Sequence, residues 1–227
     1  PGFRITGTKT SKRPLSWPSR NGRKMRANKA SSIAELLRSH YPDARCTLVF
    51  SSPFQCLCAV LLSAQCTDAK VNRVTPSLFS AYPSPKELSE ANLNQVEGII
   101  HSLGLSHSKA MHLIAMAKRI QEKYGGRVPD SYEELLDLPG VGNKTARVVL
   151  MECFHQPAFP VDTHVERVST RLGLVREGLQ PAEIGRGSFA SLLHPLWKRG
   201  VPQPKSGMRS LFFAGLLFLF LRKKHFF

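Results

Sequence analysis

Residues 138–146 read LPGVGNKTA and are the most informative segment of the chain. The capped helical pattern SYEELLD precedes the segment, and the apolar-striped pattern KTARVVLMEC continues it. Two glycines separated by one residue at a helix start leave backbone N–H groups exposed, and the helix dipole there favours an anion. The segment therefore predicts a helix-hairpin-helix that grips a DNA backbone phosphate regardless of base sequence, through Gly140, Val141, Gly142 and Thr145.

Two other motifs with a similar turn fit this segment less well. A Walker A phosphate loop needs glycine directly before its lysine, and that place is taken by Asn143. A helix-turn-helix needs a polar helix face suited to base edges, which the residues after the turn do not provide.

Lys144 is an unusual residue for the second position of a helix, because a cation in the first turn opposes the helix dipole. One interpretation is a surface lysine that contacts phosphate. The other is that the positive helix end and partial desolvation favour a neutral amine, which is a nucleophile. The position alone leaves both interpretations open.

Asp162, in the segment VDTH, favours the second interpretation. A helix over 143–153 rises about 16 Å, and residues 154–161 can span up to about 26 Å. The chain can therefore return and place Asp162 beside Lys144. Asp162 also precedes VERVSTRLG, so it is a candidate helix N-cap kept ionised by backbone N–H groups. The two roles are compatible.

The rest of the chain carries the start and stop signals of helices. Three S-x-x-E pairs predict capping boxes, and prolines follow two serines at expected first turns. Glycines predict helix ends. These signals and the helical apolar spacing predict an all-α fold of about eight to ten short helices. The signals are Ser32 with Glu35, Ser84 with Glu87, Ser131 with Glu134, Pro53, Pro85, Gly104, Gly125 and Gly173, and the apolar stripes are Ala110, Leu113, Ile114, Ala117 and Ile120, then Ala146, Val149, Leu150 and Cys153.

The formal charge of +16 on 227 residues lies in the flanks. Residues 1–30 hold nine Lys/Arg and residues 186–227 hold eight, with no acidic residue in either, whereas 31–185 hold 15 basic and all 16 acidic residues. We expect a disordered basic arm over 1–30 and salt-sensitive attraction of both flanks to nucleic acid, with anionic lipid as the competing partner.

The apolar run LFFAGLLFLFL, residues 211–221, is too short for a bilayer, which needs about twenty residues. A packed terminal helix, an interfacial anchor and an aggregation-prone segment all remain open for it.

Over about residues 31–184 the chain resembles the endonuclease III group of helix-hairpin-helix DNA glycosylases. The resemblance rests on PDARC, LLSAQCTD, SLGLSHSKA, GGRVPDSYEELLDLPGVGNKTARVVL and FPVDTHVERVSTRLGLV. It implies a two-lobed all-α fold. A six-helix barrel with the hairpin would cover 46–156, a second helical domain would combine 31–45 with 157–184, and a divergent basic and apolar tail would follow over 185–227.

The resemblance also implies the reaction. The family turns a damaged pyrimidine out of duplex DNA and cuts the bond between base and sugar. By this analogy Lys144 attacks C1′ and forms a Schiff base that breaks the strand by β-elimination, and Asp162 orients or deprotonates it. Gln65 would fill the gap left in the duplex, Leu105 would wedge into the stack, and His164 would support the site.

Each of these three accessory residues also has a plain structural interpretation. Gln65 lies near the end of an expected apolar helix over 54–66, where it could satisfy backbone carbonyls. Leu105 could be a hydrophobic contact after a Gly104 helix cap. His164 could be a hydrogen-bonded structural histidine.

The chain departs from the family in its cysteines and its end. Most members bind a 4Fe–4S cluster through the spacing C-x6-C-x2-C-x5-C, but no cysteine follows Cys153 here. Cys46, Cys56, Cys58, Cys66 and Cys153 look like reduced, mostly buried thiols scattered over helices, so we expect no cluster and no other metal or cofactor. From about residue 185 the sequence suggests an altered reading frame or aberrant end, which would leave the second domain incomplete.

The sequence thus predicts a bifunctional DNA glycosylase and abasic-site lyase of base excision repair. We expect a monomer that acts on double-stranded DNA with oxidised pyrimidines or abasic sites and does not bind membranes. Its location would be cytoplasmic and nucleoid-associated in a bacterium, or nuclear or mitochondrial in a eukaryote. Alternatives are a catalytically impaired helix-hairpin-helix DNA-binding protein and, more remotely, a peripheral membrane protein.

Overall fold

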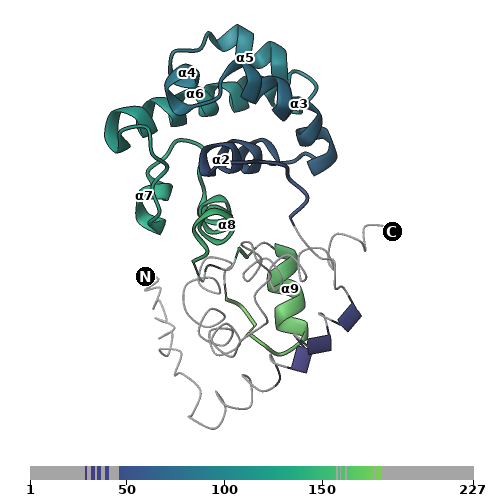
Figure 1. Cartoon of the computed structure of the whole chain (residues 1–227). Coiled ribbons are helices and arrows are strands. Elements are labelled where there is room, and N and C mark those ends of the chain that lie inside the picture. The colour runs from purple at the N-terminus through teal and green to yellow at the C-terminus, as the bar shows by residue number, and fades with distance from the viewer. Residues whose placement is uncertain are drawn as a thin grey trace, which may run out of the picture.

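The structure is a computed structural model that describes residues 46–156, 158, 160, 161, 163–175 and 177–179, with residues 29, 32, 33, 35, 36, 39 and 40. These residues form helices and no strand, which confirms the predicted all-α class (Figure 1). The helices are α2 (Pro53–Leu62), α3 (Asp68–Ala81), α4 (Pro85–Ser89), α5 (Leu93–Ile100), α6 (Ser106–Tyr124), α7 (Tyr132–Leu136), α8 (Asn143–Phe154) and α9 (Thr163–Arg171). Most of the predicted basic arm, and the tail from residue 180 with its apolar run, lie outside the described residues.

Most of the predicted helix starts are confirmed. Ser84 and Glu87 form a complete capping box at α4, and Ser131 accepts a hydrogen bond from the Glu134 N–H and donates one to its carboxylate at α7. Pro53 and Pro85 occupy the first turns of α2 and α4. Because each of these signals acts within four residues, sequence alone was sufficient to find it.

The predicted helix ends are confirmed at two of three glycines. Gly125 ends α6 with a φ of 59°, and Gly173 follows α9 with a φ of 66°. The prediction for Gly104 is wrong: α5 ends at Ile100, with His101 as its C-cap, and Gly104 does not adopt a left-handed conformation. It lies instead in the turn that connects α5 to α6.

The first core surrounds α2, which is buried on nearly every side and packs against α6 and α8 (Figure 1). Helices α4 and α5 pack on α6, and α3 contacts both α5 and α2. The predicted apolar stripes of α6 and α8 face this core, although Cys153 at the end of the α8 stripe is only half-buried. This packing fixes the positions of α2 and α6, against which the turn between α7 and α8 rests.

A second cluster of buried side chains includes one residue of α8 and residues that follow this helix. Met151 of α8 packs there with Val161, Val165, Leu174 and Val175. Ile33, from a part of the chain more than a hundred positions earlier, is packed against the same cluster. Helix α8 therefore contributes side chains to both cores.

All five cysteines are described, and all are free thiols. Cys56 and Cys58 are buried on α2 and Cys153 is half-buried on α8, as predicted. The expectation that the cysteines all lie on helices is wrong, because Cys46 precedes α2 and Cys66 lies in the turn between α2 and α3. Among the described residues, no helix has the length and apolarity needed to cross a membrane.

Glu152 of α8 gives the fold a pH dependence. Burial raises the pKa of its carboxyl group from 4.5 to about 7. The folded protein therefore favours the protonated carboxyl group. The contribution of Glu152 to the free energy of unfolding is fully present below about pH 4.5 and is lost as the pH rises through about 7. We expect Glu152→Gln to raise the free energy of unfolding by about 1–2 kcal/mol at pH 8 and by little at pH 4, after allowance for partial exposure.

Urea unfolding at the two pH values measures this difference. The exposed Glu122 of α6 provides a matched control, because Glu122→Gln should change stability equally little at both. A gain from Glu152→Gln of the same size at pH 4 and pH 8 would contradict the buried-carboxyl account.

Candidate nucleic-acid interface

The predicted hairpin joins α7 to α8 and is fixed from within by Val141. The Val141 side chain is buried in the first core, and its N–H donates to the Leu138 carbonyl at 3.1 Å. The side chain of Val141 faces the core and its N–H is used inside the turn, while its contact with DNA stays a prediction. Its contribution in the structure is to hold the shape of the turn.

The structure requires glycine at residue 140 because of close packing, whereas Gly142 lies in open space. Gly140 has a φ of 78°, and a Cβ atom there would lie 2.9 Å from Cβ of His112 and 3.1 Å from Cδ1 of Leu61. The turn is thus pressed against α6 and α2 at a distance that only glycine permits. Gly142, the N-cap of α8, has no atom within 4 Å of such a Cβ, and no side chain caps the helix. The start of α8 is therefore open toward solvent at Gly142.

Tyr132 and Arg147 hold the two helices of the hairpin together. The Tyr132 hydroxyl donates to Oδ1 of Asn143, the first residue of α8. The buried Arg147 guanidinium lies 5.0 Å from the centre of the Tyr132 ring and donates to its hydroxyl at 3.4 Å. The sequence analysis did not identify this pair, although an arginine inside the apolar stripe of α8 was a sign of a buried partner.

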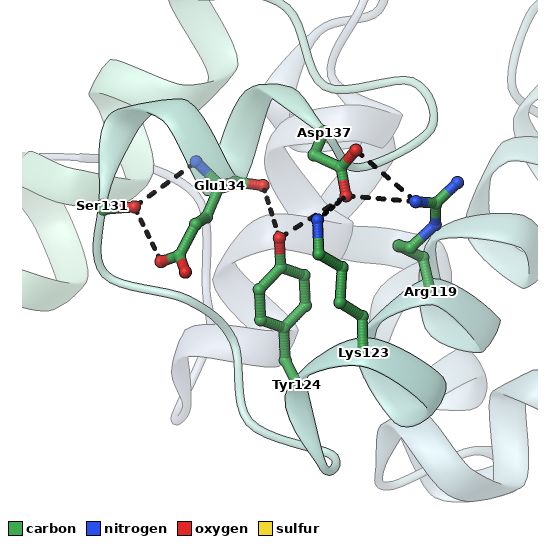
Figure 2. Close-up of polar contacts among 6 residues, drawn as sticks. All are labelled: Arg119, Lys123, Tyr124, Ser131, Glu134 and Asp137. Atoms are coloured by element: carbon green, nitrogen blue, oxygen red, sulfur yellow. Dashed lines mark hydrogen bonds and ion pairs between the residues drawn. The ribbon is translucent and has the colours of Figure 1, made fainter.

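Figure 2 shows how the end of α7 is attached to α6. Asp137 accepts hydrogen bonds from Lys123 at 3.0 Å and from Arg119 at 3.2 Å, and the Tyr124 hydroxyl lies 3.5 Å away. The hydrogen bond from Lys123 and the charge of Arg119 hold the pKa of Asp137 below its usual value. Partly exposed ion pairs stabilise only modestly, so their main effect is to orient the hairpin on α6.

Lys144 is the second residue of α8, as predicted, and its side chain is exposed. Thr145 beside it is half-buried. The expected partial desolvation of the Lys144 amine is therefore not provided by the described residues of the free protein. Asp162 lies outside the described residues, as does the side chain of His164, although the backbone of His164 belongs to α9. The convergence of Asp162 on Lys144 stays a prediction.

Gln65 and Leu105 occupy two turns with rare backbone geometry. Gln65 has a φ of 55° and Leu105 a φ of 60°, and both side chains are exposed, that of Leu105 to 62%. Non-glycine residues with positive φ are uncommon, and each costs about 1–3 kcal/mol. An exposed leucine held in such a conformation indicates a role outside the fold.

The plain structural interpretations of these two residues are wrong. Helix α2 ends at Leu62 instead of continuing to residue 66, so Gln65 does not cap it. Leu105 precedes α6, is largely exposed and follows no glycine cap, so it is not a hydrophobic contact after a helix end.

Sequence reasoning also missed a contact between these turns. The Lys109 side chain of α6 is only 4% exposed, and its Nζ lies 3.1 Å from Sγ of Cys66. Cys66 was considered only as a thiol, and Lys109 was not singled out. A lysine directly beside Ala110, the first residue of the apolar stripe, was the available sign.

Among the described residues, no group of three or more His, Cys, Asp or Glu side chains is arranged to hold a metal ion. The five cysteines do not provide the four closely spaced thiolates of an iron–sulfur cluster, because Cys66 pairs with Lys109 and the buried Cys56 and Cys58 lie inside α2. The residues present do not fit the family's cluster.

Comparison with known proteins gives a consistent result. Residues 58–188 match the family described as "HhH-GPD superfamily base excision DNA repair protein". Endonuclease III of Synechocystis sp. is 43% identical over 179 residues, which are 78% of this chain and 81% of that protein. Endonuclease III of Bacillus subtilis is 52% identical over 136 residues, which are 60% of this chain and 62% of that protein.

A solved structure shares the arrangement of the helices. A trapped covalent intermediate of an endonuclease III with DNA superposes with a TM-score of 0.70 at 38% identity, over 85% of each chain. The match to the family covers more than half of the chain, and it includes the hairpin and the first residues of α8. The chain therefore belongs to the HhH-GPD superfamily of base excision DNA repair proteins, within the endonuclease III family.

Proposed function

We propose that the protein removes oxidised pyrimidines from duplex DNA and then cleaves the strand at the abasic site, as a bifunctional glycosylase and lyase. The observation that carries the proposal is the hairpin itself: an uncapped start of α8, open at Gly142, with the largely exposed residue Lys144 in its first turn. Family membership supports the same enzymatic class.

The hairpin would bind the DNA backbone. The uncapped N-terminus of α8 offers backbone N–H groups and a positive dipole end to a phosphate, and Gly142 lets that phosphate approach closely. Thr145 lies in the same turn of the helix. The basic residues of both flanks would add affinity that does not depend on base sequence and falls with salt.

Lys144 would act as the nucleophile. Its neutral amine attacks C1′ of the flipped nucleotide, and the base leaves with the electrons of the glycosidic bond. C1′ then carries the lysine nitrogen and the ring oxygen O4′. The C1′–O4′ bond breaks, O4′ takes up the proton released by the amine, and a Schiff base forms. Loss of a C2′ proton then expels the 3′ phosphate by β-elimination. Because the Lys144 side chain is exposed in the free protein, desolvation of the amine would come from the bound DNA.

Asp162 and His164 would complete the site. A carboxylate at residue 162, beside the sugar, would stabilise the positive charge that develops as the base departs and would orient the amine. His164, two residues further along the chain, would support the same pocket.

Gln65 and Leu105 would contact the duplex where the nucleotide has been flipped out. Gln65 would occupy the gap beside the orphaned base, and Leu105 would part the neighbouring base pairs. Their exposed side chains and left-handed backbones support this role, because the strain is present before DNA binds.

The domain division follows the two hydrophobic clusters. We place the six-helix barrel over 46–156 and the second helical domain over 31–45 and 157–184, with the DNA between them. The packing of Ile33 on the cluster of Val165 and Leu174 supports this division. We further infer that this chain acts without a metal or an iron–sulfur cluster, as a monomeric protein of the nucleoid and cytoplasm in a bacterium.

The test uses a duplex that carries one thymine glycol. We expect the protein to release the base, nick the strand and, with borohydride present, form a covalent adduct of one protein with one strand. A folded protein that binds the duplex but gives no adduct would instead be the catalytically impaired DNA-binding protein considered above.

Asp162→Asn distinguishes a role in chemistry from a role as a helix cap. We expect single-turnover base release to slow by about 10²–10³-fold, because an amide carries no charge to stabilise the sugar cation. Affinity for a duplex with a stable abasic analogue should change by less than about threefold. Thr163→Ala, at the exposed first position of α9, is the matched control. Equal losses of base release and binding would make Asp162 only a cap.

A further inference from the structure

Lys109 is a buried cation whose environment the reaction does not explain. Its side chain is 4% exposed and lies on the face of α6 that also buries Ala110 and Leu113. Burial of an ammonium group is costly unless a partner compensates it. Arg119 and Lys123 of the same helix pair with the carboxylate of Asp137, and His107 with that of Glu97, whereas Lys109 donates to Sγ of Cys66 at 3.1 Å.

Lys109 connects Cys66 to the Leu105 turn through two hydrogen bonds. Its side chain donates to the Cys66 sulfur, and its backbone N–H donates to the Leu105 carbonyl at 2.9 Å. Cys66 itself directly follows Gln65. The sulfur is therefore the point at which the Gln65 turn meets the Leu105 turn.

The electrostatics of the contact agree with this geometry. Burial acts to raise the pKa of the Cys66 thiol, but the hydrogen bond from Lys109, the nearby backbone of Gly104 and the charges of Lys109 and Lys70 outweigh it and lower the pKa. A thiolate would accept the hydrogen bond from Lys109 and balance the charge of its ammonium group. Burial raises the pKa of Cys58, so the two thiols differ in character.

We propose that Lys109 and Cys66 are positioning residues that fix the Gln65 turn to the Leu105 turn, so that both side chains enter the duplex as one preassembled unit. The inference rests on the function proposed above, because it assigns these two turns to DNA. Lys109 and Cys66 would contact neither the sugar nor the base. They would act only by holding Gln65 and Leu105 in place.

The experiment compares two substrates with Lys109→Met, Cys66→Ala and Cys66→Ser. The first is a thymine glycol in a duplex, where the stack must be parted and the gap filled. The second is an abasic site in a single strand, where neither is needed. We expect Lys109→Met and Cys66→Ala to lower the single-turnover rate on the duplex about tenfold or more and to change borohydride trapping on the single strand less than about twofold.

Rescue and labelling complete the test. Cys66→Ser should recover most of the duplex activity, because a hydroxyl can accept the hydrogen bond from Lys109. Iodoacetamide should alkylate Cys66 more slowly in Lys109→Met than in wild type, since loss of the ammonium raises the pKa of the thiol. Lys118→Met, on the exposed face of α6, is the matched control and should behave as wild type.

Two results would contradict the positioning role of Lys109 and Cys66. Equal losses on both substrates would mean that the pair only maintains the fold, and unchanged rates on both would mean that it positions nothing. A wild-type protein that is inactive on both substrates would instead refute the proposed function, and the positioning role with it.

Discussion

Lys144→Ala should abolish the borohydride-trapped adduct and lower strand cleavage at an abasic site by about 10³-fold or more, as expected when a covalent nucleophile is removed. The physical reason is that no other group supplies the bond to C1′ that turns the sugar into a Schiff base. Gel electrophoresis of the reduced mixture measures the adduct directly. Affinity for the duplex should fall far less, since at most one phosphate contact is lost.

Lys144→Arg separates the two interpretations of this residue. A guanidinium keeps the positive charge at the start of α8 and still binds phosphate, but it remains protonated and cannot form a Schiff base. We expect Lys144→Arg to bind DNA as tightly as wild type and to form no adduct. An adduct of normal yield in either variant would assign the nucleophile to another amine and contradict the mechanism.

Gly140→Ala should have the largest effect on the hairpin. The new Cβ would meet Cβ of His112 at 2.9 Å, in a backbone with a φ of 78° that strains any L-residue. Because His112 and Leu61 belong to packed helices, neither can withdraw cheaply. We expect a loss of about 2–4 kcal/mol in the free energy of unfolding, measured by urea denaturation.

Gly142→Ala is the matched variant two residues away. Its φ of −99° suits alanine and the space around it is open, so stability should fall by no more than about 1 kcal/mol, mainly through a poorer N-cap. Its methyl group would stand where the phosphate is expected, and affinity for duplex DNA should fall about tenfold. If Gly142→Ala unfolded as readily as Gly140→Ala, or bound DNA normally, the hairpin would not be the phosphate site.

The success of the sequence predictions depended on distance along the chain. Caps such as Ser84 with Glu87 and the apolar stripe of α6 were predictable, because their partners lie within one or two helical turns. Gly104 was assigned wrongly, because a glycine ends a helix only if packing gives it a left-handed backbone. The contact of Cys66 with Lys109 joins residues 43 positions apart and has no local signature.

Within the site, the sequence predicted which residues form the hairpin but not the separate structural role of each. That Gly140 is required by close packing and Gly142 by an open helix start became visible only when α6 and α2 were placed beside the turn. The hydrogen-bond partners of Tyr132 and Asp137 could not be predicted either, because they depend on how α6 and α8 are placed around α7.

Helix α8 carries Lys144 in its first turn and Met151 of the second cluster in its last turn, with the first core along its flank. Its twelve residues form a rod about 18 Å long. Met151 lies seven residues after Lys144, about 10 Å along the axis. The placement of the Lys144 backbone therefore depends on how Met151 packs in the second cluster, although that cluster contains no residue of the hairpin.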